Sequence, residues 1–141
     1  MTIQIVNRQK FYRFDRAELR KLAGFFLEKS ISKKYAIELS LLLTDDDGIR
    51  LINRQFFERD GATDVISFTL KPSRGGEPAA GEIAINVERA IQEGKKRRGF
   101  WHEFALYLAH GCDHLAGHDD RTAKAREKMR RRELRWIRAY P

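Results

Sequence analysis

The stretch Ala36-Ile-Glu-Leu-Ser-Leu-Leu-Leu43 first alternates between apolar and polar residues and then becomes wholly apolar. Alternation has the two-residue period of a β-strand with one buried face, and a continuous apolar run is typical of a strand that is buried on both faces. The stretch therefore predicts a largely buried strand. Elements predicted on either side of it complete the fold.

Three further strands and several helices are predicted around this strand. Asp15-Arg-Ala-Glu18 has the form of a helix capping box and starts a helix that runs to about Lys29. The carboxylates of residues 45–47 suit a second helix start. The other strands are predicted at residues 3–6, 65–70 and 82–87, and the chain after Asn86 is predicted to be helical with breaks at residues 95–99 and near Gly117. These elements predict an α+β fold with a single four-stranded mixed sheet and about five packed helices.

One segment between the predicted strands is expected to be a loop. Residues 71–81 hold two of the three prolines and three of the ten glycines. Because proline and glycine interrupt regular structure, the segment predicts a mobile loop.

The positive charge of the chain is concentrated near its end. The 141 residues carry a net charge of +8, and nine basic residues against two acidic ones follow Asp120. The preceding residues are therefore almost neutral, which excludes a uniformly basic, histone-like protein. The hydrophobic content of 42% excludes a disordered polycation. The length predicts a single domain over residues 1–141.

The sequence also predicts a soluble protein of the cytoplasm. Cys112 is the single cysteine and has no partner for an intramolecular disulfide, which fits a reducing compartment. The N-terminus becomes charged too early for a signal peptide. The longest apolar runs fall far short of the roughly 18 residues that a membrane helix needs.

Three of the four histidines lie in the segment His110-Gly-Cys-Asp-His-Leu-Ala-Gly-His-Asp-Asp120. His110 and His114 are four residues apart, so a helix places both rings on one face, an arrangement suited to a divalent transition metal. Gly117 can turn the chain back toward this face. The residues that then offer a third ligand are His118, Asp119 and Asp120. The competing interpretation is a pair of polar residues near a helix end with no metal.

Gly111 distinguishes this segment from the motif His-Glu-x-x-His of zinc peptidases. In those enzymes the second position carries the glutamate that acts as general base. Its absence argues against a peptidase, although the metal geometry would be similar.

Several separated motifs occur in the order found in one known family. Residues 110–120 follow the pattern His-Gly-x-Leu-His-Leu-x-Gly-Tyr-Asp-His with three departures. The family's upstream partner is an Asn, an aromatic-Arg pair and then Thr-Asp-Val-Leu-Ser-Phe, of which this chain has Asn53 and Thr63-Asp-Val-Ile-Ser-Phe68. Gly81-Glu-Ile-Ala-Ile85 matches a Gly-Asp-Ile strand, and Met129 and Glu133 fit a final helix. Over nearly its whole length the chain thus resembles the YbeY family of bacterial metal-dependent endoribonucleases.

The resemblance implies a hydrolase that cleaves phosphodiesters of single-stranded RNA in ribosomal RNA maturation and ribosome quality control. It implies zinc as the cofactor, with other transition metals as alternatives, and RNA as the partner, above all ribosomal RNA and the small ribosomal subunit. By register, the metal ligands that carry the catalysis are His110, His114 and Asp120, with His118 as the rival of Asp120. The resemblance assigns no general base and no oligomeric state.

The sequence departs from the family pattern at four positions around the site. The family's third histidine, its tyrosine and its inner leucine fall on Asp120, His118 and Asp113. A carboxylate is an accepted zinc ligand, but it is a harder donor than imidazole. Aligned back from Thr63, the family's arginine falls on Phe57. Arg54 and Arg59 are the candidates for a guanidinium in the same cleft, although the motif itself does not assign either of them.

The last helix, predicted at residues 122–138, is amphipathic. Its apolar side carries Ala125, Met129, Trp136 and Tyr140, and its basic side carries Lys124, Lys128, Arg131, Arg135 and Arg138. A basic stripe suits RNA phosphates, and a solvated helix face is the alternative. Lys128 and Arg135 are therefore candidate substrate-binding residues. Arg59 and Ser67 are the corresponding candidates near the metal.

Glu133 lies within the apolar side of this helix. A lone buried carboxylate is costly, so we expect Glu133 to pair with Arg126 or with a residue near the metal helix.

Two other functions compete with an endoribonuclease. The first is a ribosome-associated assembly factor in which the metal is mainly structural. The second is a zinc peptidase, which Gly111 makes the less favoured of the two.

Overall fold

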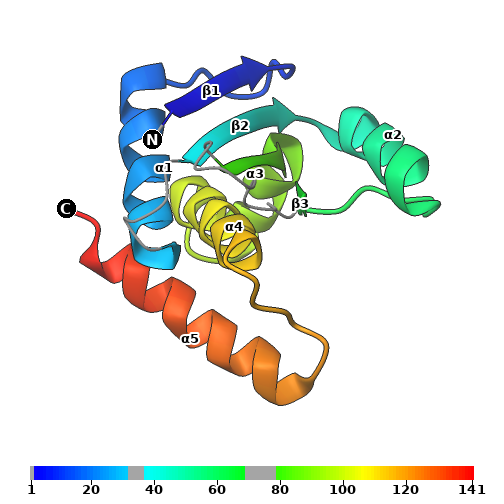
Figure 1. Cartoon of the computed structure of the whole chain (residues 1–141). Coiled ribbons are helices and arrows are strands. Elements are labelled where there is room, and N and C mark those ends of the chain that lie inside the picture. Colours follow the sequence, from blue (N-terminus) through cyan, green and yellow to red (C-terminus); the bar gives the residue numbers. More distant parts are fainter. Residues whose placement is uncertain (1, 32–36, 69–78) are drawn as a thin grey trace.

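The structure, a computed structural model, describes residues 2–31, 37–68 and 79–141 (Figure 1). These residues form four strands in one sheet and five helices. The predicted α+β fold is confirmed. Within the described ranges, no helix combines the length and the apolar character needed to cross a membrane.

The sheet has the strand order β1-β2-β4-β3. β1 (Thr2–Asn7), β2 (Ile37–Thr44) and β4 (Ala79–Asn86) run parallel to one another. β3 (Val65–Phe68) pairs antiparallel with β4 and forms an edge of the sheet. The sheet is therefore mixed, as predicted.

β4 begins earlier than the strand predicted at residues 82–87, because residues 79–81 pair with residues 37–39 of β2. The end of the predicted loop thus belongs to the sheet. The rest of that loop, residues 71–78, lies outside the described residues, as do Ala36, Thr69 and Leu70 at the ends of two predicted strands.

β2 lies between β1 and β4 and has a core on each side. Leu39, Leu41 and Leu43 are at most 2% exposed and belong to the main core. Leu42 packs against a second, smaller cluster that contains Ile49. The wholly apolar end of this strand therefore has a structural cause, since both of its faces are covered.

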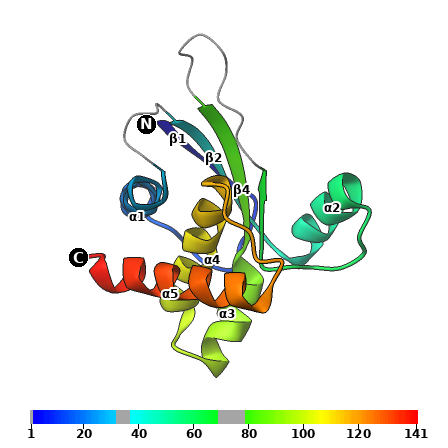
Figure 2. The same ribbon diagram turned by 60° about the horizontal axis from the view of Figure 1, so that its bottom comes forward.

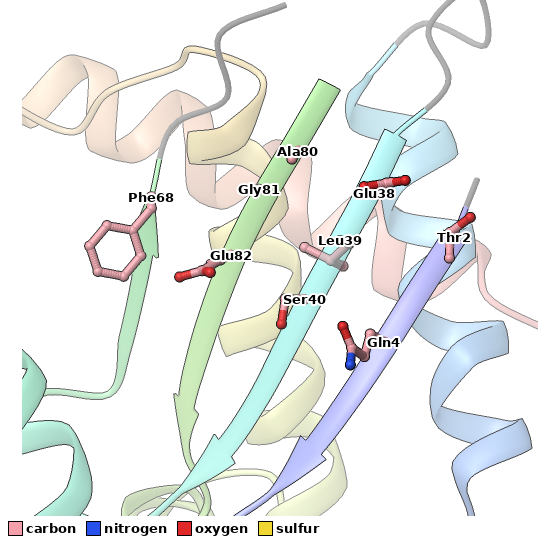
Figure 3. Close-up of a pocket in the computed structure, with 9 residues that line it drawn as sticks. All are labelled: Thr2, Gln4, Glu38, Leu39, Ser40, Phe68, Ala80, Gly81 and Glu82. Carbon is pink, nitrogen blue, oxygen red and sulfur yellow. The ribbon is translucent and has the colours of Figure 1, made fainter. Parts of the chain in front are cut away.

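Helices cover the two faces of the sheet unequally (Figure 2). α1 (Arg16–Ser30) and α4 (Phe100–Leu115) pack on one face and form the main core with it. α2 (Asp46–Phe57) lies on the other face, over the second cluster. In the part of the chain that the structure describes, no helix covers the rest of that face, and polar side chains such as Gln4, Ser40 and Glu82 line it (Figure 3).

The side chain of Asn86 forms hydrogen bonds with three other segments of the chain. It caps α3 (Val87–Lys96) by accepting from the N–H of Arg89, so this helix follows β4 without a loop. Its side-chain amide donates to Asp46 at the start of α2 and to the carbonyl oxygen of Thr63 before β3. The buried amide thereby fixes the segment that leads into β3.

α5 (Ala123–Ala139) packs against α4 after a turn (Figure 1). Its buried residues are Met129, Glu133 and Trp136, and its exposed basic residues include Lys124, Lys128, Arg131, Arg135 and Arg138. The predicted division of this helix into an apolar and a basic side is confirmed.

Candidate metal centre

The two histidines of the motif lie on the accessible edge of a helix that is otherwise almost buried. Eleven of the sixteen residues of α4 are buried. The side chains of His110 and His114 are 26% and 28% exposed. Their Nε2 atoms lie 3.0 Å apart, so the two imidazoles converge on one point, as the four-residue spacing predicts.

A glycine turn brings Asp120 to the two imidazoles. After α4 ends at Leu115, Gly117 adopts a φ of 95°, in the left-handed region that favours glycine. The N–H of Gly117 donates to the carbonyl oxygen of His114 at 2.9 Å. The chain then returns, and Oδ2 of Asp120 lies 3.7 Å from Nε2 of His110 and 3.7 Å from Nε2 of His114.

This group of three side chains can hold a divalent metal ion. One ligand atom from each residue lies within 4.8 Å of the others. Zinc binds imidazole nitrogen and carboxylate oxygen at about 2.0–2.1 Å, which places tetrahedral ligand atoms roughly 3.3–3.4 Å apart. The observed separations of 3.0 Å and 3.7 Å lie on either side of this value. Three protein ligands leave a fourth position for water or substrate, as in catalytic sites.

Each imidazole is oriented by a hydrogen bond at its other ring nitrogen. Nδ1 of His114 lies 3.0 Å from the carbonyl oxygen of His118 and must donate, because a carbonyl only accepts. Nδ1 of His110 donates to Oε2 of buried Glu133 at 2.8 Å. The Nε2 lone pairs of both rings are therefore available to a metal.

Glu133 was expected to pair with Arg126 or with a residue near the helix of the two histidines, and its partner is His110 of α4. Arg126, the other expected partner, instead donates to the carbonyl oxygen of Asp120 at 3.1 Å. α5 therefore supports two of the three candidate ligands, through Glu133 for His110 and through Arg126 for the backbone of Asp120.

The contact between His110 and Glu133 affects the protonation of both groups. Burial lowers the pKa of His110, but the hydrogen bond and the negative charge of Glu133 outweigh it, and the net effect is a raised pKa. Burial raises the pKa of Glu133. Both shifts make the pair retain a proton to higher pH. Because a metal needs the neutral imidazole, metal affinity rises with pH.

Asp113 and His118 pair with each other instead of joining the candidate ligands. Asp113 is fully buried, and its carboxylate accepts from Nε and Nη2 of Arg132 at 3.0 Å and 3.1 Å. Nδ1 of His118 lies 2.9 Å from Oδ1 of Asp113. The ring of His118 is thus engaged by Asp113, while its backbone carbonyl orients His114.

The candidate ligands open into a cleft of about 620 Å³. One wall comes from α4 and the turn after it and includes His110, His114, Asp120 and Arg121. The other wall comes from the end of α2, the following loop and β3, and includes Asn53, Phe57, Arg59 and Ser67. Two segments that are far apart in the sequence thus meet at the candidate metal centre.

The residues predicted to bind substrate fall into two groups. Arg59 and Ser67 line the cleft. Lys128 and Arg135 lie on the exposed side of α5 and do not line it. Arg54, the alternative to Arg59, pairs with Asp60 at 3.0 Å.

Arg121 is a cleft residue that the sequence analysis missed. Its signal was its position directly after Asp120, which places a cation next to a candidate ligand. The roles of Glu133 and Arg132 were only partly accessible, because their partners depend on how α5 packs against α4.

Position 111 points toward the sheet. A Cβ atom on Gly111 would lie 2.9 Å from Cγ2 of buried Ile83, closer than real Cβ contacts. A glutamate at this position would therefore clash with β4 rather than reach the cleft. The geometry gives a second reason against the general base of a zinc peptidase.

Replacement of Arg132 by methionine is expected to destabilise the protein by about 3–5 kcal/mol, because it leaves the buried Asp113 carboxylate without its main partner. Denaturation in urea measures the change. The double variant Asp113→Leu with Arg132→Met removes both charges and should recover most of this loss. Arg131→Met, which removes an exposed cation from the same helix, should cost less than about 1 kcal/mol. Equal losses for Arg132→Met and Arg131→Met would contradict the buried pair.

Replacement of Glu133 by glutamine is expected to weaken metal binding about 10- to 100-fold, because the carboxylate that orients His110 loses its charge. Competition with a chelator of known affinity measures the effect. Glu127→Gln is the matched control, since Glu127 lies on the same helix but is exposed and pairs with Arg131. The same affinity in both variants would show that Glu133 does not support the site.

Comparisons with known proteins place the chain in a family. The model of the YbeY family, described as Endoribonuclease YbeY, matches residues 4–140. An Endoribonuclease YbeY of Anaeromyxobacter sp. (strain Fw109-5) is 36% identical over 141 residues, which cover 99% of this chain and 72% of that protein. An Endoribonuclease YbeY of Geobacter metallireducens is 33% identical over 134 residues, which cover 92% of this chain and 88% of that protein. The solution structure of TM1509 from Thermotoga maritima has the same fold, with a TM-score of 0.62 at 22% identity over 96% of this chain and 87% of that one. The chain belongs to the YbeY family.

Proposed function

We propose that residues 1–141 form a single metal-dependent endoribonuclease domain that hydrolyses phosphodiesters of single-stranded RNA in the cytoplasm, in ribosomal RNA maturation and quality control. The observation that carries this proposal is the convergence of His110, His114 and Asp120 in an open cleft that also contains two arginines. The name Endoribonuclease YbeY of its relatives supports the same reaction.

The proposed metal ligands are Nε2 of His110, Nε2 of His114 and a carboxylate oxygen of Asp120. Asp120 is preferred to His118 because its Oδ2 lies 3.7 Å from both imidazoles, whereas the His118 ring bonds Asp113. Zinc is the proposed ion, since two imidazoles and one carboxylate suit it. When bound, such an ion lowers the pKa of a water molecule or polarises a phosphoryl oxygen.

The remaining residues of the cleft bind and orient the RNA. Arg59 and Arg121 are exposed cations on opposite walls and hold phosphates on either side of the scissile one. Ser67 of β3 offers a hydroxyl to a phosphoryl oxygen. Asp113 is not the general base in this proposal, because it is fully buried and bonded to Arg132.

The exposed basic side of α5 supports a second role. Lys128 and Arg135 lie outside the cleft, so they suit a longer RNA or the ribosomal RNA of the small subunit rather than the scissile phosphate. The same feature favours the alternative function, a ribosome-associated assembly factor in which the metal is mainly structural. Cleavage and binding experiments separate the two functions.

The cleavage test uses purified protein and a single-stranded RNA. Zinc-loaded protein is expected to cleave it, a chelator to stop cleavage, and added zinc to restore it. His114→Ala and Asp120→Ala should each lower the rate on the order of 100-fold or more through loss of the metal, with unchanged circular dichroism. His118→Ala should retain most of the activity. Bound metal without metal-dependent cleavage would support the assembly factor, and a loss in His118→Ala as large as in Asp120→Ala would make His118 the third ligand.

The binding test follows RNA affinity as a function of salt concentration. Each phosphate contact to single-stranded RNA contributes about 0.7 to the slope of log affinity against log salt. Lys128→Glu combined with Arg135→Glu should therefore weaken binding and flatten the slope by about 1.4. Lys10→Glu combined with Lys21→Glu changes the net charge equally on exposed residues of other segments and should leave the slope nearly unchanged. Equal slopes for the two double variants would leave the basic side of α5 as a solvated face.

A further inference from the structure

Three phenylalanine rings form an aromatic cluster at the edge of the metal cleft. Phe56 and Phe57 end α2, and Phe68 ends the described part of β3. Phe57 is 45% exposed and lines the cleft together with the candidate metal ligands. Among the described residues that line the cleft, it is the only phenylalanine, tyrosine or tryptophan.

The ring of Phe57 packs against a second phenylalanine ring. It stacks on Phe68, with ring centroids 5.9 Å apart and an angle of 21° between the planes. Phe56 contacts the ring of Phe68 edge-on, with ring centroids 5.2 Å apart. α2 ends directly after Phe57 because Glu58 adopts the left-handed conformation, with a φ of 53°. The exposed ring is thus supported by a second ring and by a fixed helix end.

The surroundings of Phe57 favour a nucleotide over a purely apolar ligand. Arg59 lines the same cleft two residues later, and Arg121 lines the opposite wall. A flat apolar ring beside two cations matches the two parts of a nucleotide, since the base can stack and the phosphate can bind a guanidinium.

We propose that Phe57 stacks on an unpaired base of the RNA, next to the phosphate held at the metal centre. The proposal rests on the proposed endoribonuclease function and deepens it, because it names the group that recognises the substrate. A base within a duplex is stacked on both faces and has no free face for Phe57. Stacking on Phe57 thus gives the cleft a physical basis for preferring single strands.

The test measures kcat/KM of zinc-loaded protein on a single-stranded RNA. Phe57→Ala is expected to lower kcat/KM about 5- to 150-fold, mainly through KM, because stacking binds ground state and transition state alike. Phe57→Trp should retain the wild-type kcat/KM. Phe57→Leu keeps the apolar bulk without a flat ring, so its kcat/KM should fall nearly as far as that of Phe57→Ala. Circular dichroism verifies that the variants are folded.

A modified RNA makes the test specific to stacking. Abasic nucleotides are placed one at a time beside the cleavage site. At one position, removal of the base should lower kcat/KM of the wild-type protein about as much as Phe57→Ala does. The same abasic RNA should not lower kcat/KM of Phe57→Ala any further.

Two controls remove exposed apolar side chains outside the cleft. Leu51 lies on α2 and is 63% exposed, and Phe11 lies before α1 and is 52% exposed. Leu51→Ala and Phe11→Ala should leave kcat/KM unchanged.

The outcomes separate this inference from the proposed function. If wild-type protein and Phe57→Ala cleave RNA equally well, the stacking role is wrong. The exposed ring is then a candidate contact for a protein partner instead. Additive losses from Phe57→Ala and every abasic position would also overturn it. If wild-type protein shows no metal-dependent cleavage of any RNA, the proposed function itself fails.

Discussion

The polar groups of α4 must be satisfied inside the core, and the arrangement of the candidate site follows from this requirement. Burial of a polar group without a hydrogen-bond partner costs roughly several kcal/mol of folding free energy. Buried Glu103 binds Arg97 after α3, while His110 and Asp113 bind Glu133 and Arg132 of α5. Among the described residues, no buried side-chain nitrogen or oxygen lacks a hydrogen-bond partner. The neighbours of α4 are thus fixed by polar contacts as well as by apolar packing, and the metal-facing edge is fixed with them.

α5 has different functions on its two sides. Its inner side supplies Arg132 and Glu133, which complete the buried polar groups of α4. Its outer side carries most of the excess charge of the chain. Arg132 adds nothing to the net charge of +8 once it is paired with the fully buried carboxylate of Asp113. Only the exposed cations remain available to an anionic partner.

The sequence predicted most of the fold because its periodicity is strong. The alternating and apolar stretch of β2, the capping box of α1 and the amphipathic pattern of α5 each correspond to an observed element. The early start of β4 was not predictable, since alanine and glycine have low strand propensity and residues 79–81 are strands only through their pairing with β2.

The candidate site was predictable to a smaller extent. Helical spacing is a local property, so it placed His110 and His114 together. The pairing of His118 with Asp113 depends on how the chain turns after α4. The presence of Arg121 and Phe57 in one cleft depends on tertiary contacts between segments that local patterns do not connect. The family pattern supplied the register of Asp120, and the structure supplied the distances around it.

The two walls of the cleft differ in how far apart their residues lie along the chain. Among the described residues, the groups that hold or orient the candidate ligands lie between His110 and Glu133, whereas the opposite wall comes from residues 53–67. A substitution in one wall therefore leaves the hydrogen bonds of the other intact. This separation makes the site modular: the residues that face a substrate can change without altering the hydrogen bonds that orient the candidate ligands. The departures from the family pattern accordingly fall in both parts, Phe57 in the substrate-facing wall and Asp113, His118 and Asp120 in the ligand-bearing segment.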